Sequence, residues 1–475
     1  MSNAKKINPI NKLMQNTLIY FIGTFMSKAF QFLFIPIITA ILMPEEYGYY
    51  DVVVTTASIV IPVITLQIID GMFRYLYNSS EQYATKLISH VVYLLYISIG
   101  ILAVFLFLIN YYTSQVQYSM LIFFYYSLFT LNMLFQKIAR SKGRNSIFAI
   151  SGVLYTFALL IFQYFFLVVL EQRINGLLMA NIIAYIISIS YIIFKTAYHK
   201  YIKIIKIDRI LIKEIIIYSI PLIPNTLSWW AIGSLNSYIV IAFLGIEYNG
   251  ILAIASKFPN LLTMATSVFQ LSWQEAAISE SENKNNSIFY SNVFNNYCKI
   301  IFLLSIIVLF FSKVFINIML GQEYSSSWLY IPPLLYAVVY STLSSFLGAG
   351  YLASKKTRGA FTTTVIGASV NIVITLLFIR DFGLFAPTMG KFIGFMVLMF
   401  IRIYDMKEYF KMTVDWKQFI LLNSISTLAI FLYYYIEGGW LYALIFISII
   451  IFFILNKVVI LKLMYKLLKR NSLYI

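Results

Sequence analysis

Three lysines lie inside long apolar stretches of the sequence, where a cation could bind an anionic group. Lys28 is 16 residues after Lys12 and 17 residues before Glu45. At about 1.5 Å per helical residue, this places Lys28 near the middle of a bilayer. Lys257 lies at a similar depth in a later stretch, and Lys391 lies in a third, nearer to one membrane interface. An intramembrane cation costs about 2.5–3.5 kcal/mol to insert, so it is usually paired or lines an aqueous path.

Two explanations for these lysines are open. They could form structural ion pairs or extend their long side chains to the membrane surface, or they could face a solvated cavity. Few acidic residues lie at a matching depth, because Asp70 and Glu275 are both near the predicted cytoplasmic side of the membrane. The sequence therefore favours cations that face a cavity.

Polar side chains recur on one face of four predicted helices, which extends this hypothesis. Their spacing of three or four residues places them on one helical face. A wet central cavity lined by the four helices explains the stripes. Close helix packing through small polar residues is the alternative. The stripes comprise Tyr20, Thr24, Ser27, Lys28 and Gln31; Thr55, Ser58 and Thr65; Asn225, Trp229, Gly233 and Asn236; and Ser256, Asn260, Thr263, Ser267, Gln270 and Gln274.

The elements that position these residues are membrane-spanning helices. Of the 475 residues, 61% are hydrophobic and 11% charged, whereas soluble domains carry about 25% charged residues. Stretches of about 20 apolar residues recur, and each can cross the bilayer as a helix with its backbone groups bonded internally. We predict an all-α integral membrane protein with about fourteen transmembrane helices, at 13–42, 51–73, 87–109, 118–138, 147–170, 176–197, 214–244, 249–278, 297–320, 328–353, 359–380, 383–403, 418–436 and 440–461.

The basic residues indicate the orientation of these helices. Of the 35 Lys and Arg residues, 29 fall in one set of alternate loops, and the other set holds Arg173, Lys313 and Arg380. Because cytoplasmic loops are enriched in Lys and Arg, we predict that both termini are cytoplasmic. The net charge of +17 is spread over these loops rather than gathered in one patch, so no nucleic-acid partner is expected.

A short internal repeat predicts the domain organisation. Lys12 precedes Glu46-Tyr47 by 34 residues, and Lys213 precedes Glu247-Tyr248 by the same distance. Six helices separate the two, which predicts bundles related by a pseudo-two-fold axis along the membrane normal, with a site between them. We expect a bundle over 1–210, a second over 211–404, and two further helices with a basic cytoplasmic tail over 405–475.

Several chemistries are not expected from this sequence. It has no Gly-rich phosphate loop and no cluster of metal ligands, and its two histidines are His90 and His199. The single Cys298 rules out an intrachain disulfide. The first apolar stretch, from Leu13, is too long for a cleavable signal. We therefore expect no catalytic residues, no metal and no cofactor, and a chain that is not an enzyme.

Five segments give the chain a resemblance to a known family. The segment 218–230, YSIPLIPNTLSWW, and the segments around Lys257 are the most specific. The chain resembles the Wzx-type oligosaccharide repeat-unit flippases over roughly residues 10–405, within the superfamily that includes multidrug antiporters and lipid II flippases. The segments are NTLIYFIG (16–23) followed by Lys28; PEEYGYYD (44–51); YSIPLIPNTLSWW; Gly250, ASKFP (255–259) and SWQ (272–274); and YLASKKT (351–357).

The resemblance implies transport of oligosaccharide repeat units on undecaprenyl pyrophosphate from the inner to the outer leaflet of a bacterial cytoplasmic membrane. It also implies membrane lipids as partners, with a polysaccharide polymerase and chain-length machinery. A pyrophosphate needs cations, for which Lys28, Arg74, Lys257 and Lys391 are the candidates. Sugars need stacking faces and hydrogen-bonding groups, and the candidates are Gln31, Asn225, Trp229, Trp230 and Asn260.

The chain differs from the family at one position, and two other functions are open. Where the family often has Asp-Arg, this chain has Asn236-Ser237, so a role carried by that charged pair is in doubt. An integral-membrane polysaccharide polymerase or glycosyltransferase could use Glu45, Glu46 and Asp51 as carboxylates. A cation-coupled small-molecule exporter is the third reading. The three functions differ in the side of the membrane on which repeat units accumulate when the protein is absent, and in whether its deletion alters drug sensitivity.

Overall fold

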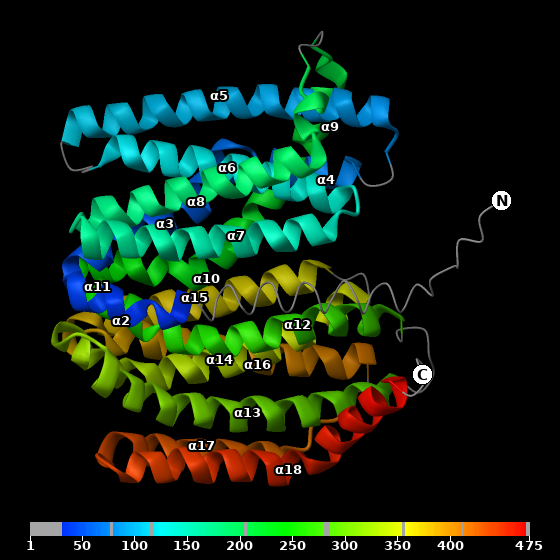
Figure 1. Cartoon of the computed structure of the whole chain (residues 1–475). Helices are drawn as coiled ribbons and strands as arrows, with labels where there is room; N and C mark the ends of the chain where they lie inside the picture. Colours follow the sequence, from blue (N-terminus) through cyan, green and yellow to red (C-terminus); the bar gives the residue numbers. More distant parts are fainter. Residues whose placement is uncertain are drawn as a thin grey trace. The chain divides into compact units, whose positions relative to one another are not determined.

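The computed structural model describes residues 31–76, 79–113, 118–203, 207–279, 286–353, 357–410 and 412–471, and every regular element within these ranges is a helix. They are α2 (Ile35–Ile41), α3 (Pro44–Ile64), α4 (Ile68–Leu76), α5 (Glu81–Thr113), α6 (Ser119–Ser141), α7 (Asn145–Tyr164), η1 (Phe165–Val169), α8 (Arg173–Thr196), η2 (Tyr198–Tyr201), α9 (Arg209–Ser219), α10 (Leu222–Phe243), α11 (Ile246–Ala255), α12 (Lys257–Ser279), α13 (Asn286–Met319), η3 (Gln322–Tyr330), α14 (Ile331–Ala353), α15 (Thr357–Phe382), α16 (Phe385–Phe410), α17 (Trp416–Tyr435) and α18 (Trp440–Asn471) (Figure 1).

Membrane-spanning helices account for the fold, as the sequence predicts. In the described ranges, 12 helices are long and apolar enough to cross a bilayer, and Gln31–Ile41 and Ile246–Ala255 are shorter apolar helices. Each of the fourteen predicted stretches coincides with one or two of these helices, although residues 13–30 of the first lie outside the described ranges. The all-α membrane fold is therefore confirmed.

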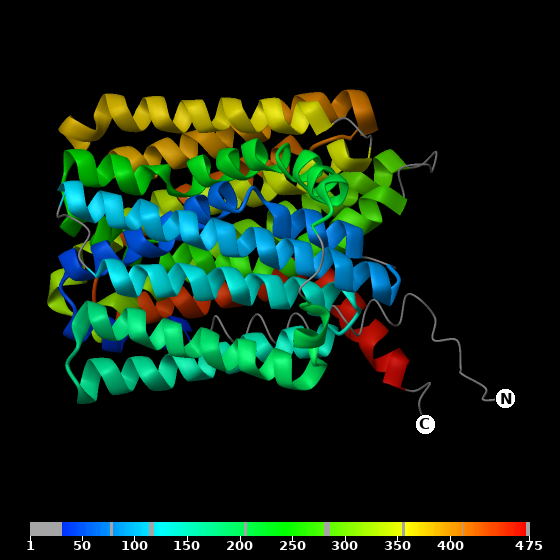
Figure 2. The ribbon, with the colours of Figure 1, turned by 90° about the horizontal axis from the view of Figure 1, so that it is seen from above.

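The helices group into two units, Met1–Leu235 and Asn236–Ile475. Within each unit the long helices run side by side, as the two views agree (Figures 1 and 2). The predicted symmetry axis and the boundary near residue 210 stay predictions.

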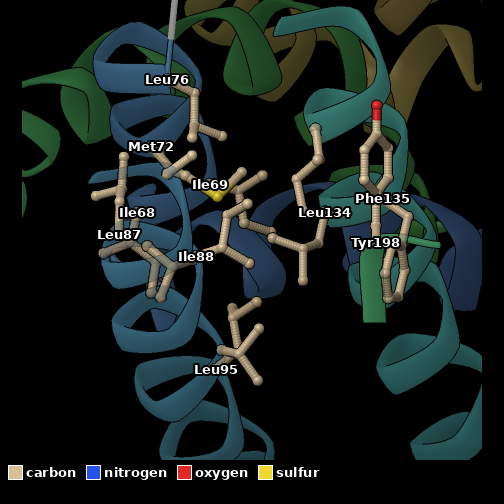
Figure 3. Packing of buried hydrophobic residues seen from close by; sticks show 14 of the residues in the cluster. Ile68, Ile69, Met72, Leu76, Leu87, Ile88, Leu95, Leu134, Phe135 and Tyr198 are labelled. Carbon is tan, nitrogen blue, oxygen red and sulfur yellow. The ribbon is translucent and has the colours of Figure 1, made fainter. Parts of the chain in front are cut away.

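An apolar cluster holds α4, α5, α6 and α9 together in the first unit. Ile69, Met72 and Ile88 are almost fully buried in this cluster. Figure 3 shows the side chains of α4 and α5 pointing toward one another and toward Leu134 and Phe135 of α6. This packing fixes the short helix α4, which is too short to be stable alone.

Glycines bring α15 and α16 into close contact in the second unit. A Cβ atom added to Gly394 would lie 2.6 Å from the carbonyl oxygen of Gly367, and one added to Gly390 would lie 2.7 Å from Thr375 Oγ1. Helices in lipid associate through such close packing, because burial from water does not drive them together.

We predict that Gly394→Ala lowers stability, because the added methyl group meets a backbone oxygen that cannot rotate away. Overpacking of this kind costs about 1–3 kcal/mol. Gly100→Ala in α5 is the matched control, since no atom lies within 4 Å of its added Cβ, and it should be neutral or stabilising by about 0.5–1 kcal/mol. Thermal unfolding of the two variants in detergent measures the difference. Equal midpoints would contradict the packing argument.

Candidate functional site

A break divides the predicted helix 51–73 into α3 and α4. Leu66 and Gln67 both adopt left-handed backbone conformations, with φ of 51° and 57°. For residues other than glycine such a conformation costs about 1–2 kcal/mol each, so surrounding contacts must hold it. Pro62 lies in the last turn of α3, and Thr65 ends that helix. The prediction of one continuous helix is wrong here, and Asp70 and Arg74 lie on a separate short helix.

A second break, between α9 and α10, lies beside the first. Ser219 ends α9 and Leu222 begins α10, around Pro221. Gln67 Nε2 donates a hydrogen bond of 2.6 Å to Thr226 Oγ1 of α10. A Cβ atom on Gly71 of α4 would lie 2.2 Å from Ser219 Oγ. The two interrupted helices are thus joined at their interruptions.

The helix α9 is held at its start by an ionic contact. Asp208 caps α9 by accepting hydrogen bonds from the amides of Ile210 and Leu211. Lys86 Nζ lies 2.5 Å from Asp208 Oδ2. This ion pair, with the two amides, holds the pKa of the Asp208 carboxyl below its usual value. His90 Nε2 accepts the backbone N–H of Asp208 at 2.8 Å, so the loop before α9 is fixed on α5.

A pocket of about 600 Å³ opens at the paired breaks. Asp70, the one acidic group in its lining, forms a 2.5 Å ion pair with Lys137 Nζ of α6. Arg74 is exposed, and none of the ion pairs in the described part of the chain uses it. The pocket therefore presents a guanidinium together with amide and hydroxyl groups, which suit a phosphate or carboxylate. Its lining is Gln67, Asp70, Phe73, Arg74, Tyr218, Leu222 and Thr226.

The tryptophans predicted as stacking residues differ in exposure. Trp229 is 45% exposed, whereas Trp230 is half-buried and its Nε1 donates to the carbonyl oxygen of Thr55 at 3.3 Å. Trp230 therefore anchors α10 to α3, and Trp229 keeps a free face. Asn225 lies on α10, but its side chain is outside the described set.

In the second unit, Lys257 begins α12 directly after a break at Ser256. The predicted stretch 249–278 is thus two helices, α11 and α12. Lys257 is half-buried, Phe258 is fully buried and Asn260 is exposed. A cation in the first turn of a helix is disfavoured by the helix dipole, so helix stability does not account for Lys257.

Lys391 lies beside a buried polar cluster. Asn236 Nδ2 donates to Asn371 Oδ1 at 3.1 Å and to the carbonyl oxygen of Pro387 at 2.9 Å. Lys391 is half-buried and lies one turn after Pro387 on α16. Asn236 therefore joins α15 to α16 at the position where the family often carries a charge.

Lys28 lies outside the described residues, and Gln31 is half-buried at the start of the described chain. The structure brings Arg74 together with Gln67 and Thr226, which sequence reasoning did not select as site residues. Pro62 and Pro221 were the available signals for these breaks.

Two buried cations were counted with the loops, although they fall within the predicted stretches 297–320 and 383–403. Arg402 is 2% exposed inside α16, and its guanidinium donates to the carbonyl oxygens of Ser344 and Ala360 and to the hydroxyls of Thr363 and Thr364. Neutral acceptors on α14 and α15 surround it, so Arg402 joins three helices. Arg402 is therefore not one of the basic loop residues that indicate the orientation of the helices.

Lys313 is the second such cation, and it is 2% exposed. Its Nζ donates to the carbonyl oxygens of Tyr433 at 2.6 Å and Ile436 at 3.0 Å, at the C-terminal end of α17. It also lies 4.3 Å from the ring centroid of Trp328. A cation at a helix C-terminus is favourable, so Lys313 has a structural role.

We predict that Arg74→Gln weakens binding of inorganic pyrophosphate to the purified protein by at least about tenfold. A charge-assisted hydrogen bond contributes about 1.5–3 kcal/mol, and tenfold corresponds to 1.4 kcal/mol. Asp70→Asn should tighten binding, because it frees Lys137. Arg144→Gln, which removes an exposed cation outside the pocket lining, is the control for net charge. Calorimetry measures the three, and an equal loss in Arg144→Gln would refute the site.

The family model described as "Polysaccharide biosynthesis protein" matches residues 13–278, more than half of the chain. No curated protein matches the sequence. The family match agrees with the resemblance carried by the sequence motifs.

Solved structures share the fold. The lipid II flippase MurJ in an inward closed conformation has 15% identity and a TM-score of 0.70, over 94% of this chain and 100% of that chain. An inward-facing multidrug resistance MATE family transporter has 14% identity and a TM-score of 0.64, over 83% and 96%. The Vibrio cholerae MATE transporter VcmN has 15% identity and a TM-score of 0.59, over 84% and 96%. At these identities the likeness establishes the fold alone.

Proposed function

Since this chain belongs to the polysaccharide biosynthesis protein family, we propose that it is a flippase for lipid-linked oligosaccharide repeat units. The substrate is carried on undecaprenyl pyrophosphate and moves from the inner to the outer leaflet of a bacterial cytoplasmic membrane. Both termini lie in the cytoplasm. A polysaccharide polymerase and chain-length machinery receive the product.

The observation that carries this proposal is the position of cations beside interrupted helices. Arg74 lines the pocket at the break between α3 and α4, and Lys257 directly follows the break between α11 and α12. In transporters, discontinuous helices and intramembrane charges mark substrate sites. A pyrophosphate is the part of the substrate that such cations would bind, and Lys28 and Lys391 complete the proposed set.

The oligosaccharide needs flat apolar faces and hydrogen-bonding groups. The exposed ring of Trp229 supplies a stacking face. Asn260 is also exposed, and its amide can donate to and accept from sugar hydroxyls. Gln31 and Asn225 belong to the same proposed set, and Trp230 supports them from the contact with α3.

The membrane potential supplies a driving force for this transport. Moving one elementary charge across 100 mV is worth about 2.3 kcal/mol. Two uncompensated negative charges moving outward therefore gain about 4–5 kcal/mol per 100 mV. Export by alternating access would then proceed without ATP hydrolysis.

A cation-coupled small-molecule exporter is the second candidate, because the MATE transporters share the fold. It predicts altered drug sensitivity on deletion of the gene, with unchanged surface polysaccharide. A membrane polymerase or glycosyltransferase instead predicts that repeat units accumulate outside the membrane.

We predict that Lys28→Ala and Lys257→Ala each lower export of repeat units by at least about tenfold, through loss of a charge-assisted contact. Lys257→Arg should retain activity, and Lys200→Ala, which removes an exposed cation from η2, is the control. Labelling of the lipid-linked intermediate with a membrane-impermeant sugar reagent should show that it accumulates inside. Normal surface polymer in both alanine variants, at wild-type protein levels, would disprove the cation role.

A further inference from the structure

The last helix, α18, is longer than a membrane crossing requires. Its apolar stretch that can cross the bilayer, Trp440–Lys457, has 18 residues. At about 1.5 Å per residue this stretch covers about 27 Å, close to the thickness of the hydrocarbon core. The whole helix has 32 residues and ends at Asn471, so 14 residues lie beyond the stretch. We call these residues, 458–471, the α18 extension, and they add about 21 Å of helix.

The α18 extension has two unlike faces. Its four basic residues are separated by steps of three or four, which places them on one side of a helix. Its apolar residues between positions 460 and 468 fall on the opposite side by the same spacing. The extension contains no acidic residue. The basic face comprises Lys462, Lys466, Lys469 and Arg470, and the apolar face comprises Ile460, Leu461, Leu463, Met464, Leu467 and Leu468.

The end of α18 turns away from the direction of its earlier turns. Both views show this change of direction at the red end of the helix (Figures 1 and 2). A straight extension would carry its apolar face out of the bilayer into water, which is unfavourable. A helix that turns where its span ends can instead lie along the membrane surface, with apolar side chains toward the acyl chains and basic ones toward the headgroups.

The span that precedes the extension is held largely by lipid. Only 17% of the stretch Trp440–Lys457 is buried inside the protein. Phe453, Ile454 and Leu455, in its last turns, are all exposed large apolar residues, and Lys457 is exposed directly after them. The extension therefore begins beside acyl chains, where the lipid headgroups are within reach of its first turn.

The charge of the extension selects the lipid. Clusters of Lys and Arg at the end of a membrane span attract anionic headgroups, and each such residue strengthens attachment by about fivefold. A zwitterionic surface would meet the same apolar face but would gain nothing from the basic one. The four positive charges without a carboxylate thus fit a membrane that contains anionic phospholipid.

We propose that the α18 extension is an interfacial anchor, which lies on the membrane surface at the C-terminal end of α18 and binds anionic phospholipid headgroups through its basic face. The anchor holds in place a span that the rest of the second unit covers only slightly. This inference concerns the bulk membrane lipid and does not depend on which substrate the protein transports.

The test uses the full chain with Cys298→Ala, which removes its one cysteine. A nitroxide is attached at Leu467→Cys on the apolar face or at Lys466→Cys on the basic face. The protein is reconstituted into vesicles of phosphatidylglycerol and phosphatidylcholine, or of phosphatidylcholine alone. In the mixed vesicles, the nitroxide at 467 should be relaxed by oxygen, which dissolves in the acyl chains, and protected from a water-soluble nickel chelate. The nitroxide at 466 should show the reverse.

Neutralising the basic face should release the extension. With the nitroxide at 467, the four-fold glutamine variant should shift the equilibrium toward the released helix by about a hundredfold, since each charge contributes about fivefold. Vesicles of phosphatidylcholine alone should release the unaltered extension. Neutralising four exposed cations of the first unit is the matched control for net charge and should change nothing. The variant combines Lys462→Gln, Lys466→Gln, Lys469→Gln and Arg470→Gln, and the control combines Arg144→Gln, Lys195→Gln, Lys200→Gln and Lys203→Gln.

Three results would overturn the proposal. Equal access of the nickel chelate to both positions would show a helix that projects into water. Protection of both positions from both reagents would show contact with protein instead of lipid. Equal protection of position 467 in the two kinds of vesicle would remove the role of the anionic headgroup. Because the measurement involves no transport, its result is independent of the lysine export test.

Discussion

Backbone groups in the hydrocarbon core must keep a hydrogen-bond partner, because an unpaired one costs several kcal/mol. This chain interrupts its helices and still meets that requirement. At the first break, the amide of Thr65 donates to Ile61 and that of Gln67 donates to Pro62. At Ser256, the amide donates to Leu252 and the carbonyl accepts from Asn260. At Ser256 the helical hydrogen bonds thus continue across the interruption, whereas at Leu66 and Gln67 the left-handed backbone places the side chains where a continuous helix would not.

Lys313, Arg402 and Arg74 represent two physical groups of cations. Lys313 and Arg402 are almost fully buried, and neutral carbonyl or hydroxyl oxygens satisfy them. Neither forms an ion pair among the described residues. Arg74 is instead exposed in a pocket whose single acid already pairs with Lys137. The first group stabilises the helix packing, and the second leaves positive charge available to a ligand.

The sequence was sufficient to predict the spans, because an apolar stretch of about 20 residues has few alternatives in a bilayer. It did not predict that 51–73 is broken, since left-handed conformations at Leu66 and Gln67 have no strong residue signature without glycine. Counting basic residues by loop misplaced Arg402, because such a count takes no account of the carbonyl and hydroxyl oxygens that neighbouring helices place around a side chain. The pairing of Gln67 with Thr226, 159 residues apart, arises from packing between helices, which no local pattern encodes.

The contact between Gly71 and Ser219 has a mechanical consequence. Ser219 Oγ occupies the space beside Gly71, so α4 and α9 are in close contact there. The Gln67–Thr226 hydrogen bond ties the following segment, α10, to the same point. A tilt of α4 would therefore strain its contact with the start of α10. The interruption between α3 and α4 and the one between α9 and α10 thus form one linked pivot. Motion that begins at one interruption can reach the other through this contact, without passing through a loop.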